Sequence, residues 1–157
     1  MYQNPFQGQI LAISISSKKG EKKCNVDQAE LLVNHGLKND AHAGTNHRQV
    51  SLLAMESIHK MQATALQVKP GDFGENITTK DINLESLIPG DLLNIGQEAI
   101  LQITQIGKEC HNPCSIYEAI GDCIMPKEGV FAKVIRAGII RPGDKIYIHS
   151  RKEHINV

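Results

Sequence analysis

The chain has 157 residues with 17 basic and 17 acidic side chains, so its formal net charge at pH 7 is zero. This length is typical of one domain, and we expect a single domain over residues 1–157. The balanced charge gives no electrostatic field that would attract nucleic acid or an anionic membrane, so we expect neither as a partner.

The start of the chain bears on where the protein resides. Residues 1–7 lack the basic start and the apolar stretch of a signal peptide, and no apolar run reaches membrane-spanning length. We therefore expect a cytoplasmic protein. Disulfides are rare in that compartment, so we do not expect the four cysteines to form them, and the chemistry of these cysteines is an open question at this point.

The first element expected in the chain is a strand. Residues 10–16 alternate apolar and polar side chains, which predicts a half-buried strand that turns Leu11, Ile13 and Ile15 towards the core. The following run, residues 17–23, is rich in lysine and has no apolar face. It predicts a solvated loop, although its lysines could contact a phosphate.

The loop over residues 36–50 is the first candidate site. Its glycine, asparagine, aspartate and threonine residues favour turns, and it places His42, His47 and Arg48 within seven residues. Arginine offers a rigid fork of donors for phosphate or carboxylate, and the imidazoles can donate to the same anion or ligate a metal. The alternative is a set of exposed loop residues with one histidine satisfied inside the fold.

Residues 51–66 give the clearest helical pattern. Met55, Ile58, Met61 and Ala65 recur at helical spacing, so we expect these side chains to pack into the core. The methionines are therefore interpreted as core residues and not as ligands.

The triplet Pro-Gly-Asp occurs at Pro70, Pro89 and Pro142. Proline presets the first central position of a type II turn, and glycine supplies the positive φ of the second. We therefore expect three such turns, each leading into a strand.

Short apolar runs make much of the remaining chain β-rich. Strands are predicted over residues 26–33, where a short helix is the alternative, and over 92–95, 100–106, 130–136 and 145–149. With one clear helix, this pattern predicts a mainly β fold, a barrel-like closed sheet with a few short helices.

Glu75 and Asn76 lie on the approach to a further expected strand. Acid and amide side chains at such places commonly cap a turn by bonding the local backbone. The alternative is that Asn76 binds the polar edge of a ligand.

The stretch 107–116 gathers the most reactive side chains of the sequence. Cys110 and Cys114 are separated by three residues, His111 lies between them and Lys108 is close by. A thiolate needs positive charge or a helix terminus to form near neutral pH, and the lysine, the imidazole and a helix expected directly after the second cysteine would supply both. We expect the rest of the chain to serve as a scaffold for this stretch.

Cys123 raises the alternative of a three-thiolate metal site with Cys110 and Cys114. The spacing C-x3-C-x8-C does not match the paired C-x2-C knuckles of structural zinc, and the local spacing offers no fourth ligand. A structural metal is the less favoured interpretation.

Several of these motifs occur together in a recognisable order, which is Asp40–Gly44 (DAHAG), His47–Leu52 (HRQVSL), Gly74–Ile77 (GENI), Pro89–Asp91, the cysteine stretch and Gly143–Asp144. In this order they resemble a stand-alone MOSC domain, a family named for the C-terminal domain of molybdenum-cofactor sulfurases. The resemblance runs roughly from residue 10 to residue 148. It implies a barrel-like fold with one functional cysteine, which carries sulfur or ligates the molybdenum of a bound pyranopterin.

Cys114, preceded by Pro113, best fits the position of that cysteine, and Cys110 supplies a second thiol nearby. The leading hypothesis is therefore a protein that binds the molybdenum cofactor (molybdopterin) or carries sulfur through a Cys114 thiolate or persulfide. Its expected partners are proteins of molybdenum-cofactor biosynthesis or sulfur transfer. The side chains expected to contact the cofactor are His42, His47, Arg48, Asn76, Lys108 and His111.

Two alternatives remain open from the sequence. One is a molybdenum-dependent reductase of N-hydroxylated substrates, with Cys114 as the metal ligand. The other is a metal-binding or thiol-sensing module that uses its cysteines. Whether the chain is an enzyme, and in what oligomeric state it works, also stay open. In each cofactor-binding case we expect Cys114, Arg48 and Asn76 to converge on one cleft.

Overall fold

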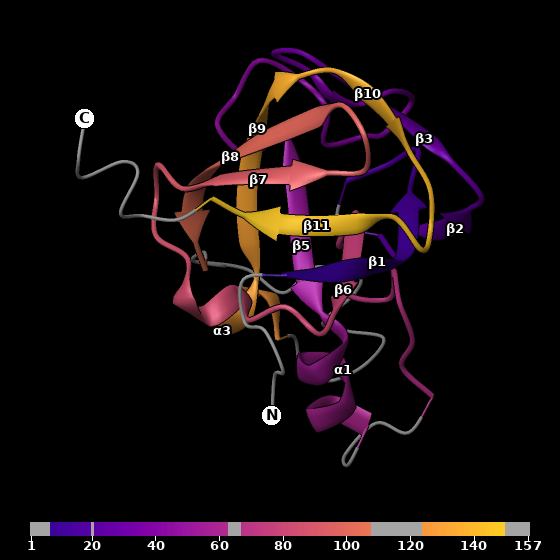
Figure 1. The fold of residues 1–157 in the computed structure, drawn as a ribbon. Helices are drawn as coiled ribbons and strands as arrows, with labels where there is room; N and C mark the ends of the chain where they lie inside the picture. Colours follow the sequence, from indigo (N-terminus) through magenta and orange to yellow (C-terminus); the bar gives the residue numbers. More distant parts are fainter. Residues whose placement is uncertain (1–6, 20, 63–66, 108–123, 150–157) are drawn as a thin grey trace.

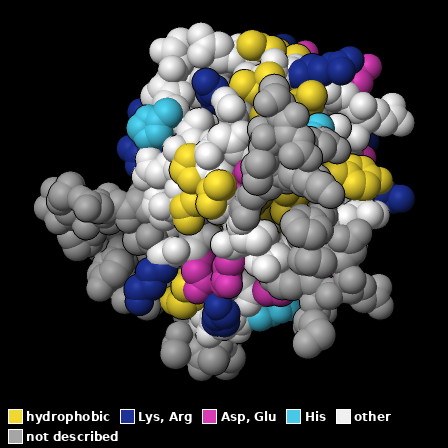
Figure 2. All heavy atoms as spheres, turned by 60° about the vertical axis from the view of Figure 1, so that its left-hand side comes forward, with side chains coloured by type: hydrophobic (Ala, Val, Ile, Leu, Met, Phe, Trp, Pro, Cys, Tyr) yellow, Lys and Arg dark blue, Asp and Glu magenta, His cyan; other side chains and the backbone are white. Residues whose placement is uncertain are grey.

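The structure is a computed structural model that describes residues 7–19, 21–62, 67–107 and 124–149. Within these residues, no helix has both the length and the apolar character that crossing a membrane would require. On the face shown in Figure 2, acidic and basic side chains are interspersed and no broad field of one sign is seen.

The main sheet closes on itself to form a barrel (Figure 1). Going round it, the strands are β1 (Gln7–Ile15), β11 (Lys145–Ile148), β7 (Leu92–Ile95), β8 (Ala99–Ile106), β9 (Val130–Arg136), β5 (Val50–Ala54) and β6 (Ile77–Lys80), which pairs with β1 again. Neighbouring strands are antiparallel except β5 and β6, which are parallel. The predicted mainly β, closed-sheet fold is confirmed.

Smaller elements surround this barrel. A short strand, β2 (Cys24–Val26), pairs with β1. A second sheet is formed by β10 (Gly138–Ile140), β3 (Ala29–Leu32) and β4 (Gly36–Leu37). Among the described residues, the α-helices are α1 (Met55–Gln62) and α3 (Met125–Glu128). Of these short strands, only β3 lies within a stretch predicted as a strand. The strands β2, β4 and β10 were not predicted, because two or three residues are too few to show a period.

Two hydrophobic clusters hold these elements together. The larger one fills the barrel and takes side chains from every barrel strand, and Leu31, Leu37 and Ile140 of the second sheet add to it. The smaller one lies between β5, α1 and α3 and contains Ile58 and Met61. The expected core role of the α1 residues is therefore confirmed, while Ala65 lies outside the described residues.

The helix predicted from residue 51 begins later than expected. Residues 51–54 belong to β5, and the helix begins at Met55. Every residue of β5 is buried, because Leu52 faces the barrel core and Leu53 faces the smaller cluster. A strand buried on both faces has a continuous apolar run with no period of two, so the sequence pattern could not separate it from the helix that follows.

The predicted orientation of β1 is wrong in its first half. Leu11 is 38% exposed, whereas Ile10 and Ile13 are 1% and 0% exposed. The register to β6 shifts between Ile10 and Ala12, so Leu11 is the extra residue of a β-bulge. Such a bulge breaks the alternation of faces, which lets Ile10 and Ile13 share the core although their positions differ in parity.

This orientation gives a direct test. Ile10→Ala is expected to lower the free energy of unfolding by about 2–5 kcal/mol, because it leaves a cavity in the barrel core. The matched change Leu11→Ala is expected to alter it by no more than about 0.5 kcal/mol. Urea denaturation of the two variants checks this, and equal losses would mean that the strand alternates without a bulge.

The turns predicted at the Pro-Gly-Asp triplets are confirmed. Gly71, Gly90 and Gly143 have φ values of 96°, 98° and 94°. In each turn the aspartate N–H donates to the carbonyl of the residue before proline, and the aspartate side chain accepts from the N–H of that same residue. The aspartate therefore closes each turn from both sides.

Candidate functional site

The buried centre of the site is an ion pair between Lys23 and Asp40. Their side chains are 0% exposed, and Lys23 Nζ lies 2.7 Å from Asp40 Oδ1. Lys23 Nζ also lies 3.0 Å from Ser16 Oγ and 2.9 Å from His42 Nδ1. The prediction that the whole run 17–23 is solvated is therefore wrong for Lys23, because a carboxylate far along the chain gives its charge a buried partner.

Asn76 ties this pair to the barrel. Its Nδ2 donates to Asp40 Oδ2 at 3.0 Å and to the carbonyl of Ser14 at 3.2 Å, and its Oδ1 accepts from the N–H of Ser51 at 3.0 Å. Asn76 is 0% exposed. It therefore joins β1, β5 and the loop after β4, and a contact of its side chain with a ligand stays a prediction.

Glu75 caps the first Pro-Gly-Asp turn from inside. Its carboxylate accepts from the N–H groups of Gly71 and Phe73 at 2.9 and 3.2 Å and from Thr78 Oγ1 at 3.0 Å. Burial raises the pKa of Glu75, and these hydrogen bonds offset that effect only in part. The interpretation that Glu75 caps a turn by bonding the local backbone is confirmed.

Burial alone shifts the pKa values of Lys23 and Asp40 in opposite directions. Burial lowers the pKa of Lys23, and the hydrogen bond and charge of Asp40 counter this only in part. Burial alone would raise the pKa of Asp40, but hydrogen bonds from Lys23, Asn76 and the Ser16 N–H, with the charge of Lys23, hold that pKa below its usual value. The carboxylate of Asp40 is thus kept ionised by its neighbours.

His47 and Arg48 form a second, exposed group at the ends of β8 and β9. Thr104 Oγ1 donates to the carbonyl of His47, and His47 Nε2 lies 2.7 Å from Gln105 Oε1. The Arg48 guanidinium lies over the ring of Phe131, 5.8 Å from its centroid. A guanidinium over an aromatic face is held by cation–π attraction while its donors stay accessible.

This second group is linked by hydrogen bonds to the residue that directly precedes the cysteine stretch. Gln105 Nε2 donates to the carbonyl of Gly107 at 2.7 Å, and the Gly107 N–H donates to the carbonyl of Gly129 at 2.7 Å. Gly107 is the last described residue before the cysteines, and Ile124 is the first described residue after them. The predicted site residues between these ends, Lys108, Cys110, His111, Cys114 and Cys123, lie outside the described residues.

The structure thus arranges the described candidates in two groups. His42 and Asn76 meet at Asp40, and His47 and Arg48 lie beside β8 and β9. Sequence analysis missed Lys23 and Asp40 as members of the first group. Asp40 heads the DAHAG motif and so carried a signal, but nothing in the lysine-rich run distinguished Lys23 from its exposed neighbours.

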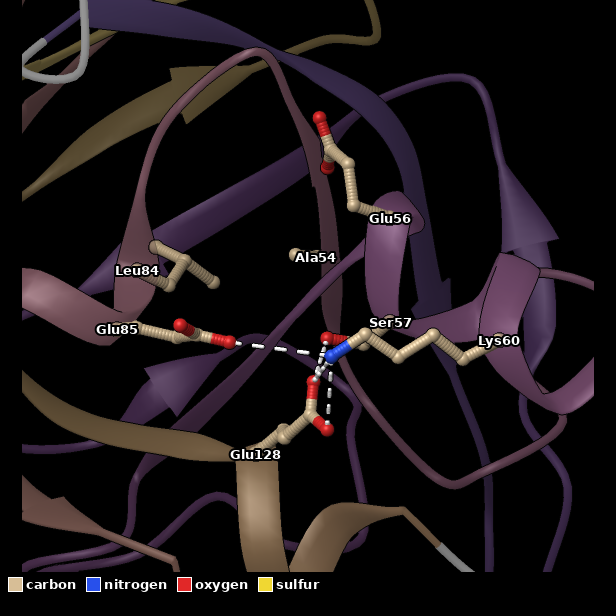
Figure 3. Close-up of a pocket in the computed structure, with 7 residues that line it drawn as sticks. All are labelled: Ala54, Glu56, Ser57, Lys60, Leu84, Glu85 and Glu128. Atoms are coloured by element: carbon tan, nitrogen blue, oxygen red, sulfur yellow. Dashed lines mark hydrogen bonds and ion pairs between the residues drawn. The ribbon is translucent and has the colours of Figure 1, made fainter. Parts of the chain in front are cut away.

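A pocket of about 100 Å³ opens between α1, α3 and the short helix η1 (Leu84–Ser86). Figure 3 shows Lys60 pointing between Glu85 and Glu128, with Nζ at 3.9 and 3.1 Å from their carboxylates. This volume is well below the roughly 300–1,000 Å³ of a typical cofactor pocket. Nowhere among the described residues do three His, Cys, Asp or Glu side chains gather as they would to hold a metal.

Solved structures share this fold. The YuaD protein of Bacillus subtilis aligns with a TM-score of 0.77 and 19% identity, covering 96% of this chain and 99% of its own. YiiM of Geobacillus stearothermophilus aligns with a TM-score of 0.69 and 20% identity, over 92% of this chain and 76% of its own. YiiM of Escherichia coli aligns with a TM-score of 0.67 and 20% identity, over 94% and 71%.

No curated protein matches the chain significantly. The profile of the MOSC domain matches residues 39–147, more than half of the chain, and takes in the DAHAG motif, β5, Asn76 and the cysteine stretch. MOSC domains are generally associated with binding of the molybdenum cofactor. Since this match covers more than half of the chain, the chain belongs to the MOSC domain family.

Proposed function

We propose that this protein binds the molybdenum cofactor, with the Arg48 guanidinium on its phosphate and the Cys114 thiolate on molybdenum. The observation that carries the proposal is the position of Arg48. Its loop is hydrogen-bonded to β8 immediately before the cysteine stretch begins, and its guanidinium lies over a residue of β9, the strand that follows the stretch. This placement supports a shared site for the two motifs.

The described residues suit the anionic part of such a cofactor. Arg48 is exposed, so its planar fork of donors is accessible to a phosphate. Molybdenum needs a soft thiolate, and in this proposal the cysteine stretch, which begins directly after the hydrogen-bonded Gln105 and Gly107, supplies it. When bound, the cofactor supplies redox or sulfur chemistry at molybdenum, and the part of this chain is to bind and orient it.

Metal and pterin analysis of the protein purified from its native host tests the proposal. We expect molybdenum and a fluorescent pterin oxidation product in equal amounts, lost in Cys114→Ser and kept in the control Cys110→Ser. Cyanide-labile sulfur without metal would support a sulfur carrier in place of a cofactor-binding protein. Zinc or iron without pterin would contradict both.

Arg48→Lys is expected to weaken cofactor binding about 10- to 100-fold. Lysine keeps the charge but loses the paired donors, and one charge-assisted contact of this kind is worth about 1.5–3 kcal/mol. Fluorescence titration of the apoprotein with pterin cofactor measures the change.

Arg136→Lys is the matched control, because Arg136 is also exposed but lies at the far end of β9 from Phe131. It should bind like the parent protein. If Arg48→Lys also binds like the parent but unfolds at a clearly lower temperature, Arg48 has a structural role. The exposed lysines of residues 17–22 would then be the next candidates for the phosphate site.

A further inference from the structure

The hydrogen bonds around Lys23 determine where hydrogens sit in the buried cluster. A lysine ammonium has three N–H donors, and three acceptor positions surround Lys23 Nζ, on Asp40, Ser16 and His42. The carboxylate of Asp40 only accepts. Ser16 Oγ donates its single hydrogen to the carbonyl of Lys18 at 3.0 Å, so towards Lys23 it must accept. The third ammonium hydrogen is therefore directed at His42 Nδ1, 2.9 Å away.

We infer that Lys23 fixes His42 as a neutral imidazole whose ring proton is on Nε2. A ring nitrogen that accepts from an ammonium cannot carry a hydrogen of its own, so Nδ1 is the bare nitrogen. Protonation of Nδ1 would place two N–H groups and two positive charges against each other. Lys23 is thus a positioning residue, which acts through the ring of His42.

The other charged groups near the cluster favour the same arrangement. Asp40 Oδ1 is paired with Lys23, and Asp40 Oδ2 accepts from the backbone N–H of His42 at 3.2 Å, so one carboxylate orients both partners. Glu75, from the loop before β6, adds a negative charge that acts on Lys23. Both carboxylates favour the charged form of Lys23, which is the form that donates to the imidazole.

The sequence allowed two roles for His42, which are hydrogen-bond donation to an anion and coordination of a metal. The position of the ring proton decides between them. A histidine that ligates a metal usually donates its other ring N–H to a carboxylate or a carbonyl. Here the other ring nitrogen, Nδ1, accepts from an ammonium. Coordination of a metal through Nε2 would therefore require an imidazolate, in which neither ring nitrogen carries a hydrogen. The Nε2 N–H of His42 is therefore a hydrogen-bond donor and not a metal ligand. That it donates to a phosphate or carbonyl oxygen of a pterin cofactor rests on the proposed function.

Long-range ¹H–¹⁵N NMR of the histidine rings tests the inference on the full chain without cofactor. The His42 signals are identified by their loss in His42→Gln. We expect the neutral form with the proton on Nε2, unchanged as the pH falls below about 6.5, the ordinary histidine pKa. In Lys23→Met the His42 ring should take up a proton near that pH, whereas the control Lys22→Met, an exposed neighbour, should behave like the parent.

A proton on Nδ1, or a charged His42 ring in the parent protein at pH 7, would overturn the inference even if Lys23→Met fails to fold. A second measurement concerns the donor role. Glutamine can place an N–H near the position of Nε2, so His42→Gln should bind pterin cofactor within about threefold of the parent, and His42→Leu about tenfold more weakly. Equal losses in both variants would contradict the donor role. If the parent itself binds no cofactor, the proposed function fails and the NMR result alone decides the inference.

Discussion

Asp40→Asn is expected to lower the free energy of unfolding by about 3–5 kcal/mol, which is the usual cost of removing one partner from a buried ion pair. The side chain keeps its size, so no cavity forms. The carboxylate accepts four hydrogen bonds, from Lys23 Nζ, the N–H groups of Ser16 and His42, and Asn76 Nδ2. An amide at this place would turn its own N–H₂ towards donors and remove the carboxylate that is hydrogen-bonded to Lys23. Urea denaturation at pH 7 measures the loss.

A double-mutant cycle measures the interaction energy between Lys23 and Asp40 apart from their contacts with other residues. The double variant Lys23→Met/Asp40→Asn removes both charges, so it should lose less stability than the sum of the two single variants. The exposed pair of Lys60 and Glu85, with side chains 58% and 72% exposed, supplies the control. Glu85→Gln should change the stability by less than about 1 kcal/mol. Additive single losses would show that Lys23 and Asp40 do not stabilise each other.

The same pair gives a pH dependence of known sign. The folded-state pKa of Asp40 lies below the ordinary value of 3.8, so its contribution to stability is present above that value and is lost as the pH falls through the folded pKa. The acid limb of the stability curve should therefore be shallower in Asp40→Asn than in the parent protein.

Gly71→Ala is expected to lower the free energy of unfolding by about 2–5 kcal/mol, from two causes. An L-residue is strained at the φ of 96° that the turn requires. A Cβ at this position would also lie 2.5 Å from the carbonyl oxygen of Lys23 and 2.9 Å from Ser14 Oγ. The backbone of Lys23, whose N–H donates to the Gly71 carbonyl at 2.9 Å, would have to move.

Gly90→Ala and Gly143→Ala are matched controls for this change. Their φ values of 98° and 94° impose the same strain, but a Cβ at either position would meet nothing within 4 Å. Each should therefore cost only about 1–2 kcal/mol, the strain alone. Thermal or urea unfolding of the three variants gives the comparison. Equal losses in all three would mean that the turn before β6 is not pressed against Lys23.

The sequence by itself determined the features that depend on neighbouring residues. Proline, glycine and aspartate set the three turns within four residues each, and the helical spacing of Ile58 and Met61 placed them in the core. The order of the motifs pointed to the MOSC domain family, which the profile match confirms. Local chemistry and short-range periodicity suffice for such features because each residue involved contacts others only a few positions away.

The tertiary structure alone decided the features that depend on distant partners. The bulge at Leu11 exists only because β1 pairs with β6, and β5 is a strand because two clusters cover it on opposite faces. Lys23 is buried while its lysine neighbours are exposed, since Asp40 is brought to it from 17 positions along the chain. Three identical turn triplets likewise differ only in what packs against them. A short segment of sequence contains none of these partners. The burial that they provide holds the ion pair and the ring of His42 in position.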